Sequence, residues 1–181
     1  MKIEGAHIPR SSFLSMEKDT EIIINNLMKN ERLKRLLYYT TPDALERPNI
    51  TDEESIEVLQ KSIKLIPKIG VDKDVLTYIE IVYDDFSETS NPEFRDNLIE
   101  FNILCHHNQW KLKDFALRPY KIAGEIDAMF NHKKISGLGK LNFYTATKLL
   151  TDDEYSGVCL IYNAVHGEED KKVMPNPQSE L

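Results

Sequence analysis

The sequence has few cysteines and no long apolar stretch, and each of these absences excludes a class of protein. Cys105 and Cys159 are the only two cysteines in the 181 residues. Both lie in apolar, strand-like patterns, which is typical of buried free thiols in a reducing compartment and not of a disulfide framework. No run of 18 apolar residues occurs, so we expect no transmembrane helix and no membrane partner. The first residues, Met1–His7, lack the apolar core of a signal peptide.

Basic residues are also in the minority. The chain has 23 Lys and Arg against 30 Asp and Glu, which gives a formal net charge of -7. Proteins that bind DNA directly usually carry a basic face, so this balance argues against DNA binding. The hydrophobic share of 41% and charged share of 29% are ordinary for a soluble globular protein. The length fits one domain with extensions.

No motif for catalysis or metal binding is complete. In Cys105-His106-His107, alternation along a strand lets Cys105 and His107 share a face but excludes His106. Two ligands leave a zinc site short by two, and no Cys-x-x-Cys or His-x-x-x-His pair occurs elsewhere. Residues 137–140, Gly-Leu-Gly-Lys, lack the spacing of a phosphate loop and predict a turn before a strand. No Ser lies in a Gly-x-Ser-x-Gly turn. We therefore predict no enzyme, no catalytic, cofactor-binding or metal-binding residues, no cofactor, and His106 and His107 near the surface.

The clearest structural pattern is the alternation over residues 97–106. It predicts a strand with one face in the core and with Glu100 and Asn102 facing away from it. The residues predicted to face the core are Ile99, Phe101, Ile103 and Cys105. Residues 76–83 alternate in the same way and predict a second strand. Residues 84–96, rich in Asp, Ser, Asn and Pro, predict a connecting loop between the two strands.

A helix is predicted from Arg118 to Phe130. Pro119 fits the first turn, where a missing N–H costs least, and Asn131 fits the C′ position. The apolar residues at helical spacing are Ile122, Ala123, Ile126, Met129 and Phe130. Trp110, ahead of this helix, is either an interface anchor or a lid on the core.

The N-terminal third predicts three helices. The first covers residues 18–30, and Asn30 caps a second, short one. Thr51–Glu54 forms a capping box that begins the third. The apolar stripes of the first two helices contain Ile22, Ile23, Leu27, Leu33, Leu36 and Leu37, with Ile24 and Met28 widening the first stripe. Residues 63–69 fit either a continuation of the third helix or an edge strand, because Pro67 is tolerated at a sheet edge.

Two further strands are predicted over residues 140–150 and 155–165. The second has apolar residues on both faces, which predicts an internal strand covered on each side. The acidic stretches Asp84-Asp85 and Asp152–Glu154 are interpreted as solvated turns. The order of elements predicts an α+β fold: a mostly antiparallel sheet with helices packed on one face and an N-terminal helical segment. We expect an N-terminal arm over residues 1–15, a single domain over 16–166, and an acidic flexible C-terminal tail over 167–181.

The same motifs, in the same order, resemble a known family. The acidic segment between two strands leads into Leu98–Trp110, then Arg118–Asp127, the Gly-Leu-Gly turn and the final strand Gly157–His166. Over residues 75–166 this pattern resembles neck and tail-completion proteins of tailed bacteriophages, the group that includes tail terminators. Tyr38–Pro42 is similar to the start of such proteins in phages of Gram-positive hosts.

This resemblance implies a structural virion protein that acts by contact alone. Members of the family are small α+β proteins that form rings, commonly hexamers, at the head-proximal end of the tail tube. The resemblance implies a homohexameric ring that caps the tube and joins it to the neck, after assembly in the host cytoplasm. Its partners would be the tail tube or sheath protein and the neck or connector protein, with DNA only as passing cargo, which a negative net charge suits. The arm and the acidic tail depart from the family pattern and leave the identity of the ring open.

Two hypotheses that assign the chain to other classes of protein stay open. A non-viral soluble adaptor or protein-binding module without catalysis has the same composition. A hydrolase requires three convergent polar groups in one pocket, which the sequence does not indicate.

Overall fold

The computed structural model describes residues 11–65, 77–135, 137–151 and 154–166. The helices are α1 (Met16–Lys29), α2 (Glu31–Tyr38), α3 (Asp52–Ser62) and α4 (Arg118–Phe130), with the short 3-10 turns η1 (Phe13–Ser15), η2 (Ala44–Glu46) and η3 (His107–Gln109). The strands are β1 (Ile63–Lys64), β2 (Thr77–Glu88), β3 (Arg95–His106), β4 (Lys134–Ile135), β5 (Gly139–Lys140), β6 (Asn142–Leu150) and β7 (Tyr155–His166). None of the described helices is long and apolar enough to cross a membrane.

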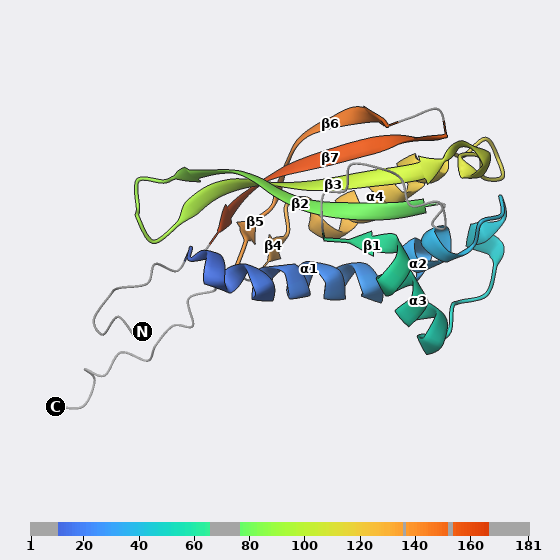
Figure 1. Cartoon of the computed structure of the whole chain (residues 1–181), viewed down its shortest axis with the longest axis horizontal. Helices are drawn as coiled ribbons and strands as arrows, with labels where there is room; N and C mark the ends of the chain where they lie inside the picture. Colours follow the sequence, from blue (N-terminus) through green and yellow to red (C-terminus); the bar gives the residue numbers. More distant parts are fainter. Residues whose placement is uncertain (1–10, 66–76, 136, 152–153, 167–181) are drawn as a thin grey trace.

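The described strands form one main sheet with the order β1-β2-β3-β7-β6 and a small β4-β5 pair. Only the β1-β2 pairing in the main sheet is parallel, and the other three are antiparallel. The helices lie on one side of this sheet (Figure 1). The predicted α+β class, with a mostly antiparallel sheet and helices on one face, is therefore confirmed.

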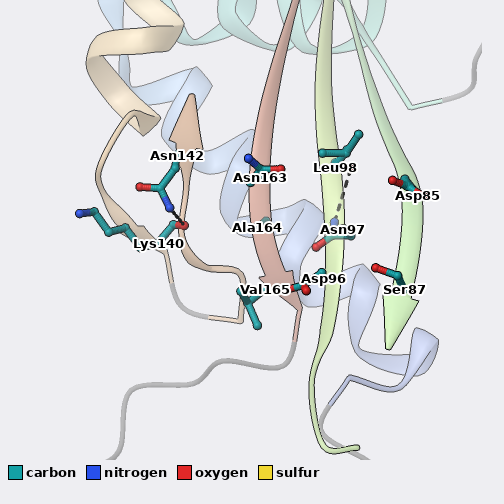
Figure 2. Close-up of a pocket in the computed structure, with 10 residues that line it drawn as sticks. All are labelled: Asp85, Ser87, Asp96, Asn97, Leu98, Lys140, Asn142, Asn163, Ala164 and Val165. Atoms are coloured by element: carbon teal, nitrogen blue, oxygen red, sulfur yellow. Dashed lines mark hydrogen bonds between the residues drawn. The ribbon is translucent and has the colours of Figure 1, made fainter. Parts of the chain in front are cut away.

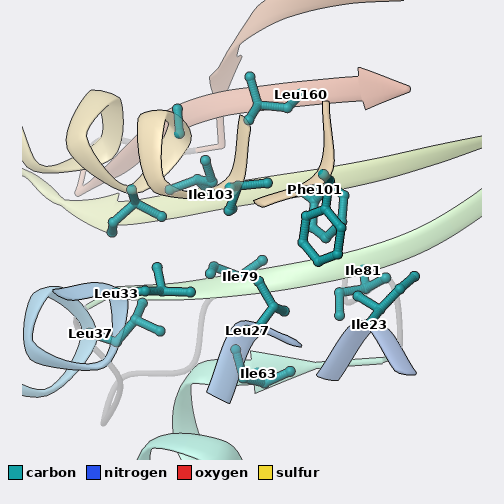
Figure 3. Packing of buried hydrophobic residues seen from close by; sticks show 14 of the residues in the cluster. Ile23, Leu27, Leu33, Leu37, Ile63, Ile79, Ile81, Phe101, Ile103 and Leu160 are labelled. Atoms are coloured by element: carbon teal, nitrogen blue, oxygen red, sulfur yellow. The ribbon is translucent and has the colours of Figure 1, made fainter. Parts of the chain in front are cut away.

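The core lies between the helices and the inner face of the sheet (Figure 3). Ile99, Phe101 and Ile103 are fully buried there, as predicted, while Glu100 and Asn102 on the outer face are partly exposed. Phe101 stacks on Phe130 of α4 with ring centroids 5.2 Å apart. Of the apolar residues predicted for α4, Met129 alone is only partly buried.

The predicted N-terminal helices form, and their caps explain where two of them begin. The Asn30 side chain accepts the Leu33 N–H at 3.0 Å and starts α2. Thr51 and Glu54 make both hydrogen bonds of the capping box and start α3. Beyond α3, Ile63–Lys64 is an edge strand, which settles the alternative left open by the sequence for those two residues. The described residues do not include Pro67, residues 1–10 of the predicted arm, the tail (residues 167–181) or Asp152-Asp153.

The predicted loop over residues 84–96 is wrong. β2 continues to Glu88 and β3 already begins at Arg95, so the two strands form one long ribbon. The register shifts between Asp84 and Ser87, and Asp85 has φ 51°. A bulge of this kind tolerates Asp. Most side chains of the ribbon are polar and exposed, so the ribbon shows no apolar alternation. The pair Asp84-Asp85 thus lies in a strand, not in a turn.

The end of α4 also differs from the prediction. Asn131 is the C-cap with φ -63°, and His132, one residue later, adopts the left-handed conformation with φ 58°. The Gly-Leu-Gly turn predicted before a strand leads from β4 into β5, which pair with each other, and the strand predicted from Lys140 is divided into β5 and β6. Gly137 has φ 86°, and a Cβ there would overlap the Asp19 carboxylate. The glycine therefore permits a close approach to α1.

Strand β7 is internal to the sheet, between β3 and β6, as predicted. The prediction that both faces are covered is wrong for the described part of the chain, because its helices pack on one face only. The outer face carries a small cluster of Tyr78, Leu104 and Tyr155, with Leu149 partly buried against it. Neighbouring side chains of the sheet, not a second layer, bury the apolar residues of this face.

Candidate interaction surface

The three residues of the Cys-His cluster face different partners. Cys105 is buried, and its Sγ lies 3.4 Å from the Thr77 hydroxyl. The His106 ring, half-buried, meets Tyr155 edge-on. His107 is exposed, and its Nε2 lies 2.9 Å from the Ser156 hydroxyl. In the described part of the chain, no three His, Cys, Asp or Glu residues are grouped so that they could hold a metal ion.

Both cysteines are buried free thiols, as predicted. Burial raises the pKa of the Cys105 thiol. Burial, together with the charge of Glu100, raises the pKa of the Cys159 thiol to about 11. Both thiols therefore stay protonated at neutral pH, and a thiolate is the form that reacts or binds a metal.

A polar pocket of about 380 Å³ lies where the β2-β3 ribbon leaves the sheet (Figure 2). Its lining includes Asp85, Asp96, Lys140, Asn142 and Asn163 from five neighbouring strands. The polar lining residues carry carboxylates, carboxamides, one amine and the Ser87 hydroxyl, and the lining contains no His or Cys to act as a base or nucleophile. This pocket offers hydrogen-bonding groups but no recognisable catalytic pair.

A different surface gathers exposed apolar side chains at the opposite end of the sheet. We call it the aromatic corner and define it as Trp110, Phe115, Leu117 and Tyr120. Phe115 is fully exposed, Leu117 and Tyr120 are exposed to smaller degrees, and Trp110 is partly buried. The Trp110 and Tyr120 rings meet edge-on with centroids 6.4 Å apart. Phe115 and Tyr120 are two exposed aromatics within a few residues of each other in the sequence, which makes this corner a candidate protein interaction site.

Phe115 lies in a backbone conformation that bulky residues rarely adopt. Asp114 has φ 57° and Phe115 has φ 60°, and the Ala116 N–H donates to the Lys113 carbonyl at 3.1 Å. Positive φ at both central residues is the pattern of a type I′ turn, for which Asn-Gly is the preferred sequence. A side chain with Cβ in the left-handed region costs about 1–2 kcal/mol. The chain therefore carries local strain at the residue whose ring is most exposed.

The base of the aromatic corner is fixed by a buried guanidinium. Arg118, the first residue of α4, is 0% exposed, and the described structure places only backbone carbonyls, no carboxylate, around its guanidinium. Its acceptors are the carbonyl oxygens of Gln109 at 2.8 Å, Leu36 at 2.6 Å, Tyr39 at 2.7 Å and Thr41 at 2.8 Å. Burial lowers the pKa of Arg118, although a guanidinium still stays charged at any physiological pH. One side chain thus joins the end of α2, the segment after it, η3 and α4.

Further hydrogen bonds hold the turn on this base. The Leu112 N–H donates to the Ala116 carbonyl at 2.8 Å, and the Lys113 N–H donates to the Pro42 carbonyl at 3.0 Å. Trp110 Nε1 donates to the Cys105 carbonyl at 3.0 Å. The Trp110 nitrogen is therefore bonded inward, while its partly buried ring contacts Tyr120. A role of Trp110 as an interface anchor stays a prediction. A side chain held in place before binding loses less entropy when a partner binds.

Sequence reasoning singled out Trp110 but missed Phe115 and Arg118. The signal for Phe115 was a lone aromatic residue among Lys111, Lys113 and Asp114, where a turn sequence would be polar. No local pattern indicated that Arg118 is buried, because its partners come from carbonyls as far as 82 residues away in the sequence.

No curated protein matches this chain significantly. A family model described as YomW matches residues 30–164, from the cap of α2 into the last residues of β7, and so includes the whole aromatic corner. The match covers well over half of the 181 residues. The chain therefore belongs to the YomW family, which points to a phage-associated protein.

Proposed function

We propose that this protein is a structural virion component that forms a homo-oligomeric ring, most simply of six copies, at the head-tail junction of a tailed phage. In this role it acts as a tail terminator or tail-completion protein, capping the tail tube and joining it to the neck. The observation that carries the proposal is the aromatic corner, an exposed ring on a strained turn over a rigid base. Such a surface suits binding to another protein, and the family match supports a phage setting.

The proposed ring requires contacts between copies of a particular symmetry and size. A ring requires heterologous contacts, in which one surface of a subunit meets a different surface of the next. A permanent contact of this kind buries more than about 1,200 Å². The net charge of -7 suits a ring through which DNA passes without binding. The tube or sheath protein and the neck or connector protein are the proposed neighbours above and below the ring.

The test is made on the purified protein and on the phage that encodes it. Light scattering and electron microscopy of the full-length chain are expected to show closed rings of uniform mass. Mass spectrometry of purified virions is expected to detect the chain, and immunogold labelling to place it at the junction of head and tail. A phage lacking the gene is expected to give filled heads and unattached tails. A monomer or two-fold dimer that is absent from virions would overturn the proposal and favour a soluble adaptor.

A further inference from the structure

We infer that the Phe115 turn of one copy docks into an apolar groove between α1 and β2 of the next copy. This inference rests on the proposed ring and specifies its contact. The groove has a volume of about 500 Å³, ample for one aromatic ring. Its apolar lining comprises Met16 and Ile24 of α1, Leu65 after β1, and Ile81 and Tyr83 of β2.

The groove exists because the edge of β2 is only partly covered. β1 pairs with β2 at Ile79 and Glu80 alone, and no other described strand pairs with that edge of β2. The Tyr83 hydroxyl lies 3.1 Å from the Thr20 hydroxyl and closes the floor between strand and helix. Burial raises the pKa of Tyr83 to about 12, so the floor is uncharged at neutral pH. Leu65, half-exposed, leaves apolar surface facing solvent.

Charge favours the Phe115 turn as the occupant of this groove. Glu17 and Glu21 are exposed residues of α1 that line the groove and give it an acidic rim. Lys111 and Lys121 are exposed residues beside the Phe115 turn, which itself contains Asp114. The other charged residues beside the turn form two ion pairs, Lys113 with Glu46 and Arg47 with Asp43, so the surroundings of the turn carry a small excess of positive charge. Opposite charges around an apolar contact set its orientation and speed association. A second copy of this chain therefore supplies both the shape and the charge that the groove requires.

The positions of the two surfaces place the contact between copies. The first half of α1 and the segment that leads into α4 lie toward opposite ends of the elongated molecule (Figure 1). A turn at one end therefore cannot reach a groove toward the other end within one subunit. Two copies that exchange both contacts would form a two-fold dimer, whereas the proposed ring requires each turn to enter the groove of the next copy. Repetition of such a contact gives a ring if the rotation closes, and a filament if it does not.

The inference is tested by mixing two variants. Phe115→Ser removes the ring from the turn, and Leu65→Glu places a charge in the groove at a half-exposed position. Tyr144→Ser, at an exposed aromatic residue of β6, is the matched control. Light scattering is expected to show that each of the first two variants alone is monomeric, while the control assembles like the wild type. An equimolar mixture of the two variants is expected to form dimers and nothing larger, because one intact turn meets one intact groove.

Other results of this experiment would contradict either the docking inference or the closed ring. If Phe115→Ser assembles like the wild type, or the mixture stays monomeric, the docking inference is wrong even though wild-type rings would still support the proposed function. If the wild type forms open filaments while the mixture forms dimers, the docking inference stands and the closed ring is wrong. Circular dichroism of each variant checks that a loss of assembly is not a loss of fold.

Discussion

The two ends of the sheet are each fastened by a buried charged side chain, but in different ways. At the aromatic corner, Arg118 donates to four backbone carbonyls. At the other end, His166 of β7 lies 2.8 Å from the Asp19 carboxylate of α1, and both side chains are almost fully buried. The His166 Nε2 also lies 3.2 Å from the Ser12 carbonyl.

The two buried contacts differ in the backbone segments that they connect. The Asp19–His166 pair joins one helix to one strand and closes the domain where the N-terminal segment enters it. Arg118 joins the start of α4 to η3 and to residues 36–41 with a charge that does not titrate, which fixes their relative positions at every physiological pH. The second arrangement suits a surface whose shape must be ready before a partner arrives.

The largest expected effect comes from removing the guanidinium. Arg118→Met is predicted to lower the free energy of unfolding by about 3 kcal/mol or more, because each buried carbonyl left without a donor costs about 1–3 kcal/mol. Arg118→Lys keeps the charge but lacks the fork of donors, so it is expected to recover only part of the loss. Urea unfolding of the three proteins measures this. A loss below about 1 kcal/mol for Arg118→Met would show that the base of the corner is held by other contacts.

A smaller loss is expected at the opposite end. Asp19→Asn removes the charge from the pair but leaves an amide oxygen that can accept a hydrogen bond from His166. The free energy of unfolding is therefore predicted to fall by about 1–3 kcal/mol. Asp96→Asn, at an exposed residue near the same end, is the control and is expected to change stability little. If Asp19→Asn lowers the free energy of unfolding by more than Arg118→Met does, the predicted ranking of the two buried contacts is wrong.

A small gain in stability is expected in the middle of the sheet, on its outer face. Burial, with the charge of Asp84, raises the pKa of Glu100 above its usual value of 4.5. The folded protein therefore binds this proton more readily than the unfolded chain, and the charged form costs stability above the folded pKa. Glu100→Gln is predicted to raise the free energy of unfolding at pH 7 and to lose this advantage as the pH falls from the raised pKa of folded Glu100 to the usual value of 4.5. Glu88→Gln, at an exposed residue, is the control. If Glu100→Gln raised the free energy of unfolding equally at pH 7 and at about pH 4.5, the electrostatic explanation would be wrong.

The sequence predicted the layers of this fold better than its ends. Ile99, Phe101 and Ile103 alternate because one face of β3 is buried, and Asn30 and Thr51 are caps whose hydrogen bonds are local, so both signals can be read from neighbouring residues. The ribbon over residues 84–96 escaped prediction because most of its side chains are polar and give no apolar period, and because Phe86 is covered by Phe13 from a distant part of the sequence.

The candidate interaction surface was only partly predictable, for a related reason. Trp110 is recognisable by residue type alone, whereas the importance of Arg118 depends on carbonyls of distant segments. Phe115 contradicts the local rule for its turn, and residues that break a local rule are expected at functional sites.

The central claim is that Phe115 occupies a strained backbone position because its ring docks into a neighbouring copy. The substitution Phe115→Gly tests this claim most directly. Glycine fits the left-handed backbone without the cost of a Cβ, and at Phe115 the ring is fully exposed, so its loss leaves no cavity. Measured by urea unfolding in dilute solution, where light scattering shows single subunits, the variant is predicted to be more stable by about 1 kcal/mol. At higher concentration it is predicted not to assemble. A variant that is less stable than the wild type, or that assembles as the wild type does, would contradict the account.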